Sequence, residues 1–523
     1  MSKSTSSFHT IRLSLADIVG KEYMKAVCQS HSCLSGEDWQ VLLMSACRPV
    51  DWYPEGRHRR LLKHLPQVGQ RLCAGTSVSA AGVTTQAFAD ASHCGMAPIN
   101  GYGFYRMGEN GCLYLLTKSE HYHAPLGHAF PGYALLDTAR RLGIPNATHN
   151  NTRGHITRLL EERLLRAANG LQIDTSPALA PILDDKRLDC LNRVLNLETG
   201  SLAVEAGLKM MLARHYRVQA DSPEPPYRGR TPVFLVMGND DKGLLANYHG
   251  TTMLTQMLRG MWPDLYAGLE GLSLLRACPI RPNSIEDLEE AFARYERPPY
   301  KIAGFLHEIV MMNYGARLLS REFLQHAYSL CARHDVPVLV DEIQSCLWAP
   351  GLFLFKEYDL KPSFVALGKG FPGGEYPASR LLFSTAMDNL PQFGALVTNG
   401  QEELASLAYL ITMHWALVNA EAIRRIGDNY EERLHELAAR YPGIIAGIAG
   451  QRHLSGIEFH DLETARAFTN ALNRSGFDIS AQTYKAECPP VALTKIPLTA
   501  CTTVTDFVID RMSGVLDAIG CPG

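Results

Sequence analysis

Short apolar runs alternate with helical segments through the middle of the chain, from about residue 197 to residue 399. Four runs of apolar and β-branched residues predict buried strands, at 233–237, 302–307, 336–340 and 364–367. Between them, apolar residues spaced at i, i+3 and i+4 predict helices, for example over 203–217 and 320–334. Strands that alternate with helices are typical of a parallel sheet with crossover connections, so the sequence predicts an α/β fold.

The pattern changes on both sides of this region, which predicts further domains. Residues 1–95 are rich in helix-forming segments and predict an N-terminal helical extension. Glycine-rich turns and short apolar runs then indicate strands, so we expect 96–195 to form part of a small domain and the entry to the large one. The large α/β domain is expected over 196–400. Residues 401–523 begin with a long helical stretch and predict a smaller α+β domain.

Composition and charge fit a globular protein and disfavour several classes of partner. Of 523 residues, 46% are hydrophobic and 20% are charged, as in ordinary globular domains. The 50 basic and 53 acidic residues leave a net charge of −3, too small to draw the chain to nucleic acid or to an anionic membrane. A basic cluster at 57–60 reads as the solvated face of a helix, because no aromatic residues are interleaved with it.

Two further features bear on the compartment. The longest apolar helix-like stretch, 407–420, is interrupted by Thr412 and His414 and predicts a core helix, not a membrane span. The N-terminus has no continuous apolar region of the kind found in secretion signals. The 13 cysteines are scattered without a C-x-x-C pair, so we expect a reducing, cytoplasmic compartment.

Candidate chemistry follows the predicted strands, since ligands of open α/β sheets bind at the carboxyl ends of the strands. Asp341 and Gln344 follow one strand, Lys369 follows another, and Glu308 follows a third. We therefore expect an amine, an amide and two carboxylates at one edge of the sheet.

Lys369 is the most specific of these residues, because glycines flank it on both sides. A lysine held at a strand end loses hydration, and its amine then becomes a nucleophile that can form an imine. Taken alone, Gly-Lys-Gly favours a lysine in a surface turn, because turn lysines are common, and the residues around it do not match a phosphate-binding P-loop. Asp341 has two readings as well, as a helix cap or as an acid opposite a heterocyclic nitrogen.

An anion site is predicted where a glycine and a hydroxyl residue open a helix. Gly200 and Ser201 precede a helical run, so backbone N–H groups and the helix dipole would point at a phosphate. An ordinary capped helix is the alternative. Tyr248 lies in a turn next to His249 and Gly250, where its ring could cover a planar ligand.

Together these residues resemble the class III aminotransferases, pyridoxal-phosphate enzymes of fold type I. The closest stretch, VPVLVDEIQSCLWAPGLFLFKEYDLKPSFVALGKG, is similar to that family's Asp-Glu-Val-Gln strand and the following strand that ends in Gly-Lys. ETGSLAVEAGLKM resembles its Ser-Gly-Thr-Glu-Ala helix start, ANYHG its aromatic-His-Gly turn, and LGHAFP its Leu-Gly-His element. The resemblance covers roughly residues 100–523 in the family's order.

The resemblance implies a role for each candidate residue, with pyridoxal 5'-phosphate as the cofactor and 196–400 as the domain that binds it. Lys369 would bind the cofactor as an imine and move the proton, and Asp341 would pair with the pyridinium nitrogen. Gln344 would contact the hydroxyl side of the ring, Gly200 and Ser201 would hold the phosphate, and Tyr248 would stack on the ring face. Glu308 would support the edge of the cofactor. Thr398 would reach the phosphate of the cofactor bound by the partner subunit. This last contact implies a homodimer with shared active sites.

The chain departs from the family pattern on the substrate side. Leu202 replaces a usual Glu, the segment 345–351 replaces a glycine-rich turn with an arginine, and Asn313 replaces a Glu found in some members. Lys495 stands where the family often has an arginine that grips a carboxylate, so Lys495 is a tentative substrate residue.

The expected function is transfer of an amino group between an amino acid or amine and a keto acid or aldehyde. The same scaffold hosts racemases, aminomutases and lyases, and a non-catalytic relative is a further alternative. A metal-dependent enzyme using His121, His123 and His128 is the least favoured reading, because these histidines lack a carboxylate or cysteine at ligand spacing. No metal is therefore expected.

Overall fold

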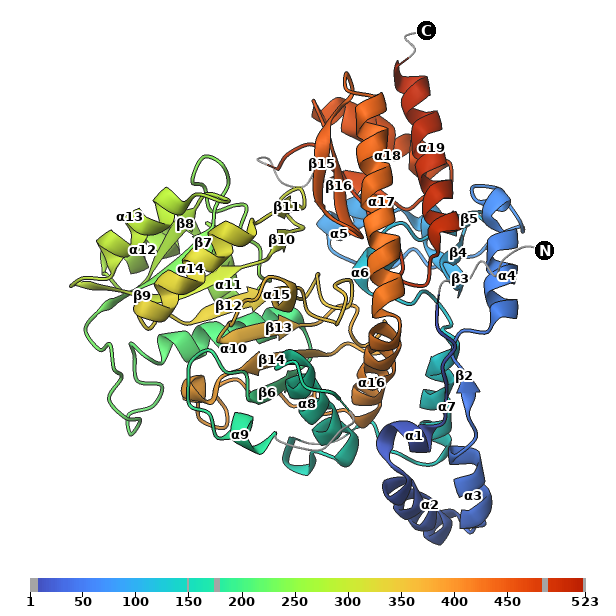
Figure 1. Ribbon diagram of the computed structural model, residues 1–523, viewed down its shortest axis with the longest axis horizontal. Coiled ribbons are helices and arrows are strands. Elements are labelled where there is room, and N and C mark those ends of the chain that lie inside the picture. The colour runs from blue at the N-terminus through green and yellow to red at the C-terminus, as the bar shows by residue number, and fades with distance from the viewer. Residues whose placement is uncertain (1–7, 148–149, 174–178, 482–487, 521–523) are drawn as a thin grey trace.

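A seven-stranded sheet forms the centre of the molecule (Figure 1), in a computed structural model that describes residues 8–147, 150–173, 179–481 and 488–520. The strand order is β6-β14-β13-β12-β9-β7-β8. In this sheet β14 runs antiparallel to β6 and β13, its two neighbours, and all other pairs are parallel. The strands are β6 (Arg193–Leu197), β7 (Thr231–Met237), β8 (Arg276–Ile280), β9 (Tyr300–His307), β12 (Val338–Asp341), β13 (Phe364–Leu367) and β14 (Ser379–Phe383). The predicted α/β fold with a mainly parallel sheet is confirmed.

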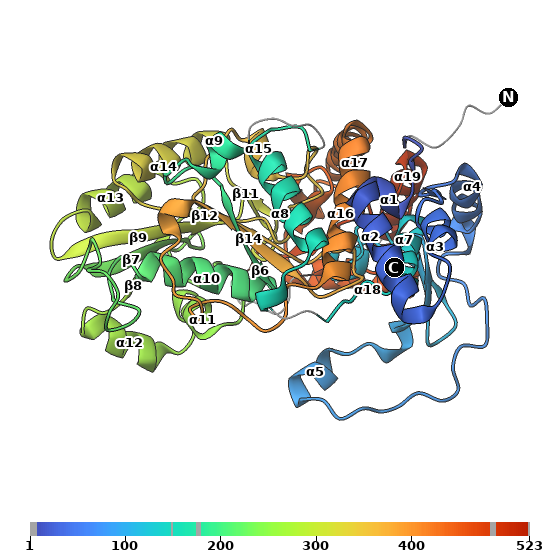
Figure 2. The same cartoon turned by 90° about the horizontal axis from the view of Figure 1, so that it is seen from below.

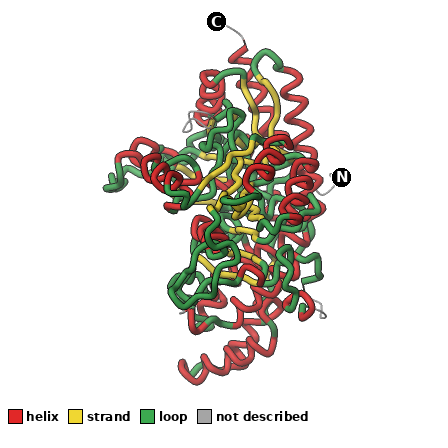
Figure 3. The backbone as a smooth tube through the Cα atoms, turned by 90° about the vertical axis from the view of Figure 1, so that its left-hand side faces the viewer, coloured by secondary structure: helices red, strands yellow, loops and turns green. Residues whose placement is uncertain are grey.

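Helices cover both faces of this sheet, which explains why its strands are continuous apolar runs. One face packs against α10 (Gly200–Leu212) and α11 (Met253–Leu258). The other face packs against α13 (Ile285–Tyr295) and α14 (Arg321–Arg333). Both predicted helices are therefore present, and the first ends five residues earlier than expected. Figure 3 shows the strands in the interior and the helices around them.

A second, smaller core lies beside the large sheet (Figure 1). It combines the antiparallel sheet β15-β16-β18-β17 with the antiparallel sheet β3-β4-β5 and the C-terminal helices. The strands are β3 (Pro98–Tyr102), β4 (Tyr105–Gly108), β5 (Leu113–Leu115), β15 (Ile445–Gln451), β16 (Leu454–Phe459), β17 (Ser480–Ala481) and β18 (Val491–Leu493). The helices are α17 (Ala420–Arg440), α18 (Leu462–Arg474) and α19 (Thr502–Gly520). Segments from both ends of the chain thus share one core, while the domain boundaries given above stay a prediction.

The helix α16 (Glu403–Val418) is buried along most of its length and packs against α8 (His155–Ala168). This confirms the core helix predicted around 407–420. None of the helices in the described ranges is long and apolar enough to cross a membrane.

The N-terminal part is helical, as predicted, but its basic cluster was misread. Its helices are α1 (Leu15–Val19), α2 (Lys21–Ser35), α3 (Trp39–Ala46) and α4 (Glu55–Lys63), with a short β1–β2 pair (Arg12–Leu13, Val50–Asp51). In α4, Arg57 and His58 are buried, because the helical period turns them inward with Leu61. The Arg57 guanidinium donates to the His128 carbonyl (3.1 Å) and lies 3.9 Å from the centre of the Tyr102 ring. The other two residues of the cluster, Arg59 and Arg60, are exposed to solvent.

Short elements complete the connections between these layers. The helices are α5 (Gln86–Ala91), α6 (Ser119–Tyr122), α7 (Ala134–Arg141), α9 (Ala180–Leu183), α12 (Pro263–Gly271) and α15 (Leu354–Glu357), and β10 (Val310–Met311) pairs with β11 (Arg317–Leu318). In Figure 2, the segment that carries α5 projects from the body of the molecule.

Candidate active site

One cavity of ≈ 240 Å³ lies at the carboxyl ends of the central strands. It brings together the candidates Gly200, Ser201, Tyr248, Glu308, Asp341, Gln344 and Lys369. Six of these residues lie at four strand or helix ends that are far apart in the sequence, and Tyr248 lies in the loop between β7 and α11. The convergence of the strand ends follows from the parallel sheet. Thr398 and Lys495 are not on the wall of this cavity.

Lys369 lies two residues after the end of β13 and has a left-handed backbone conformation, with φ of 44°. A non-glycine residue in this region is strained, and such strain persists where the surroundings hold the residue in place. Gly370 allows this close packing, because a Cβ there would lie 2.8 Å from the Tyr122 carbonyl oxygen. Loss of hydration lowers the pKa of Lys369 to about 8, although the carboxylates of Glu308 and Asp341 oppose the shift.

Asp341 ends β12 and is fixed by two hydrogen bonds. Its Oδ1 accepts the backbone N–H of Ile343 (3.0 Å), and its Oδ2 lies 2.9 Å from Nδ1 of His249. Both side chains of the Asp341–His249 pair are 4% exposed. The sequence places His249 only in a turn beside Tyr248, and nothing in it indicates that β12 supplies the partner of this histidine.

Glu308 and Gln344 form the next part of the wall. The Gln344 amide donates to Oε1 of Glu308 (3.4 Å), and Oε2 of Glu308 accepts the backbone N–H of Met312 (3.0 Å). His249, Glu308 and Asp341 offer ligand atoms within 4.8 Å of one another. In the described ranges, this is the one group of three such residues close enough to share an ion, and it contains none of the three histidines considered above.

The N-terminus of α10 forms another wall of the cavity. Thr199 is the residue before the helix, and the backbone N–H groups of Gly200 and Ser201 belong to the first turn, where helices leave N–H groups without intrahelical partners. Gly200 is required by packing, because a Cβ there would lie 2.4 Å from Cδ1 of Ile343. The Ser201 hydroxyl accepts the backbone N–H of Thr251 (3.3 Å), which ties this turn to the Tyr248–Gly250 segment. The wall therefore suits an anion.

Aromatic and imidazole side chains complete the lining. Tyr248 borders the cavity, and the Arg259 guanidinium lies 4.8 Å from the centre of its ring. His123 and Tyr376 also line the cavity, and neither was predicted to belong to a cofactor site. They come from loops, whose course the sequence pattern does not predict.

Lys495 lies behind the cavity, with 0% exposure. Its ammonium group sits 4.1 Å from the centre of the Tyr122 ring and 3.8 Å from that of Trp348, and it donates to the Gln344 carbonyl. Burial and the nearby Lys369 hold the pKa of Lys495 well below its usual range. The structure therefore places Lys495 beneath aromatic rings and not in contact with the cavity.

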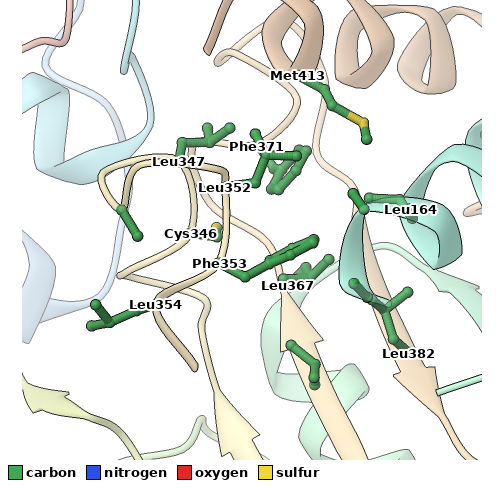
Figure 4. Packing of buried hydrophobic residues seen from close by; sticks show 14 of the residues in the cluster. Leu164, Cys346, Leu347, Leu352, Phe353, Leu354, Leu367, Phe371, Leu382 and Met413 are labelled. Atoms are coloured by element: carbon green, nitrogen blue, oxygen red, sulfur yellow. The ribbon is translucent and has the colours of Figure 1, made fainter. Parts of the chain in front are cut away.

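The segment 345–351, which replaces the family's glycine-rich turn, and the two residues after it are mostly apolar and buried. Cys346, Leu347, Leu352 and Phe353 are buried and pack near Phe371 (Figure 4). Phe353 and Phe371 are stacked with ring centroids 6.3 Å apart. Apolar packing thus holds this segment, and Gly351, with φ of 78°, is the one glycine it keeps. Thr398 lies apart from the site, exposed in the connection between β14 and α16.

Comparisons with known proteins agree with this geometry. The model of the family "Aminotransferase class-III" matches residues 147–491, a narrower range than the resemblance suggested. An ornithine aminotransferase of Halalkalibacterium halodurans is 26% identical over 65% of this chain and 78% of its own length. The ornithine aminotransferase of Emericella nidulans is 31% identical, but over only 36% of this chain and 40% of its own length.

Solved structures share the fold. The PMP-bound aminotransferase of Vibrio fluvialis superimposes with a TM-score of 0.65, at 19% identity, over 85% of this chain and 96% of that chain. The ornithine aminotransferase of Toxoplasma gondii gives a TM-score of 0.63, at 19% identity, over 88% and 95%. Since the family model covers most of the chain and the fold agrees, this chain belongs to the class III aminotransferases, which are pyridoxal-phosphate enzymes of fold type I.

Proposed function

We propose that the cavity at the strand ends holds pyridoxal 5'-phosphate and that this chain uses it to move an amino group between an amine or amino acid and a keto acid or aldehyde. One observation carries the proposal. A lysine amine, a buried carboxylate paired with histidine, and a helix N-terminus line the same cavity.

The residues present fit the cofactor by their donor chemistry. Lys369 offers the amine that attaches it, and the α10 N-terminus with Gly200 and Ser201 offers N–H groups for its phosphate. Asp341 offers a fixed carboxylate for the ring nitrogen, Gln344 an amide for the ring hydroxyl side, Tyr248 a ring face, and Glu308 an acid at the edge. When bound, the cofactor supplies a conjugated ring that withdraws electrons from the carbon bearing the amine.

The chain's own residues then control charge and protons. His249 keeps the Asp341 carboxylate oriented, because its Nδ1 binds Oδ2 at 2.9 Å. The lowered pKa of Lys369, about 8, leaves part of the amine neutral near physiological pH. A neutral Nζ can take a proton from a substrate carbon and return it, which is the role proposed for Lys369.

The proposed assembly is a homodimer in which Thr398 reaches the phosphate site of the partner subunit. The exposed position of Thr398, outside its own cavity, supports this assignment. A cytoplasmic location is proposed as well. The exposed thiols of Cys33, Cys73 and Cys94 are free, as in reducing compartments.

A visible absorption spectrum tests the proposal. We expect the purified protein to show the band of lysine-bound cofactor, and borohydride to fix the cofactor on Lys369. A panel of amines and amino acids, with ornithine and acetylornithine included because relatives carry those names, should convert the band to the amine form and release a carbonyl product. A band that no donor converts, with washout of isotope at the substrate carbon, would favour racemase, aminomutase or lyase chemistry. A protein that takes up no cofactor would refute the site and leave only the fold.

A further inference from the structure

A segment between the N-terminal helices and β3 projects from the body of the molecule and is exposed along its whole length. We define the arm as residues 77–92, which contain α5. Every residue of the arm is exposed, and α5 buries none of its side chains. Val78, Val83 and Phe88 are 85%, 104% and 69% exposed. Figure 2 shows the arm standing away from the body of the molecule.

The arm is held at both ends, so its projection is not the fraying of a free tail. Before it, the backbone N–H of Thr76 donates to the Glu109 carbonyl (2.9 Å). After it, the Gly95 carbonyl accepts the N–H of Asn110 (3.1 Å), and the Ala97 carbonyl accepts the N–H of Glu109 (2.9 Å). A connection of this length that presents apolar side chains to water is expected to serve a binding purpose.

The charge of the arm limits what it can bind. Asp90 is its only charged residue, and small or apolar residues make up most of the rest. A segment without basic residues has no attraction for nucleic acid or for an anionic lipid surface. Its chemistry suits an apolar protein surface.

Such a surface is present on the same side of this chain. The helices α11 and α12 and the turns beside them expose Met253, Trp262, Leu265, Leu272 and Leu274, with Leu272 73% exposed. We call these five residues the α11–α12 face. In Figure 2, α11, α12 and the arm lie along the same lower edge of the molecule. Because the arm and the α11–α12 face lie on the same side, two copies of this chain related by a two-fold axis can each place their arm on the other's face.

We propose that the arm of one protomer docks on the α11–α12 face of a second copy of this chain, with Phe88 as its anchor. The proposal rests on the homodimer of the proposed function and adds the contact that holds it. The arm lies outside the residues matched by the family model, so the contact belongs to this chain's own extension. Because α11 begins three residues after Gly250, which lines the cavity, a docked arm would border the mouth of the partner's cavity.

Photo-crosslinking of the full-length holoenzyme tests the docking directly. The photoreactive residue p-benzoylphenylalanine replaces Phe88, the protein is irradiated, and the adducts are mapped by mass spectrometry. We expect a band of twice the subunit mass and a crosslink between the arm and residues 253–274 of another chain. A crosslink within one chain, a crosslink to a different surface, or no crosslink would overturn the proposal.

A matched pair of variants gives a second measurement. Val83→Ser combined with Phe88→Ser should raise the dimer dissociation constant at least tenfold in sedimentation equilibrium. Leu34→Ser removes an equally exposed side chain (89%) from α2, far along the chain from both surfaces, and should leave the constant within twofold. Equal constants for the double variant and the wild type would refute the role of the arm. The visible band of the bound cofactor, recorded on the same samples, reports separately on the proposed function, so failure of the arm contact can be distinguished from failure of the cofactor site.

Discussion

His249 and Asp341 form a buried pair at the carboxyl end of the sheet, with 2.9 Å between Nδ1 and Oδ2. The imidazole holds one oxygen of the carboxylate, and the backbone N–H of Ile343 holds the other. A carboxylate restrained in this way keeps one orientation toward the cavity, which a lone aspartate at a strand end would not. The pair is the structural basis for the proposed contact with the cofactor's ring nitrogen.

Removing the imidazole should weaken cofactor binding. His249→Leu leaves the Asp341 carboxylate without a charge-assisted hydrogen bond, worth about 1.5–3 kcal/mol. We expect the dissociation constant of pyridoxal phosphate, measured by titration of the apoenzyme, to rise roughly ten- to hundredfold. His249→Asn, which keeps an N–H donor near the position of Nδ1, should recover part of this loss. Equal affinity in the Leu variant and the wild type would contradict the positioning role.

Asp341→Asn should separate binding from turnover. The amide keeps the size of the side chain but cannot hold a proton on a pyridine nitrogen. Cofactor binding is expected to stay measurable while kcat falls by orders of magnitude. Stopped-flow measurement of the half-reaction with a good donor checks this, and unchanged kinetics would refute the assignment.

The lowered pKa of Lys369 predicts how cofactor capture depends on pH. Only the neutral amine attacks an aldehyde, and burial lowers the pKa of this amine to about 8. The rate constant for growth of the visible band after mixing apoenzyme with cofactor should rise roughly tenfold per pH unit below 8 and level off above it. A flat rate between pH 6 and pH 9 would count against Lys369.

Lys369→Ala should abolish both the band and turnover, because Lys369 is the one lysine among the described residues that line the cavity. Exposed Lys361→Ala is the matched control and should retain both. Retention of the band in the Lys369 variant would show that another lysine binds the cofactor.

Lys495 allows a test of substrate recognition. If its ammonium gripped a carboxylate, Lys495→Met would raise KM for a carboxylate-bearing donor and spare the matching amine without a carboxylate. Because Lys495 is enclosed between Tyr122 and Trp348, we expect Lys495→Met to change KM by the same factor, within about twofold, for both donors. Steady-state kinetics with the two donors distinguish these outcomes. A selective increase of tenfold or more for the carboxylate donor would establish a direct contact.

Glu403 provides a test of stability away from the cavity. Its carboxylate, on α16, accepts the backbone N–H groups of Ile156 (2.8 Å) and Thr157 (3.1 Å) at the start of α8. Glu403→Ala leaves two buried donors without partners and should cost roughly 2–4 kcal/mol of unfolding free energy. Urea denaturation checks the loss. Exposed Glu421→Ala, at the start of α17, is the control and should change stability by less than about 0.5 kcal/mol. Equal midpoints for both variants would contradict the capping role.

Local pattern was enough to predict the central strands and the polar residues that follow them. The runs 233–237, 302–307 and 364–367 are buried strands because helices cover both faces of the sheet, and such strands must be apolar throughout. Ligands bind at the carboxyl ends of parallel strands, which predicts that Lys369 and Asp341 lie close together. Both residues line the same cavity. The interpretation of residues 57–60 failed because a charge cluster does not reveal which half of a helix packs inward.

The sequence by itself determined the α/β class, four of the seven strands of the central sheet and the residues that follow them, because each of these follows from the spacing of residues along one segment. Only the tertiary structure decided which side chains become partners across segments. It paired His249 with Asp341, enclosed Lys495 between two aromatic rings, and left every residue of the arm exposed. The physical reason is that hydrogen bonding and burial depend on distances between residues that are far apart in the sequence, and local spacing does not encode those distances.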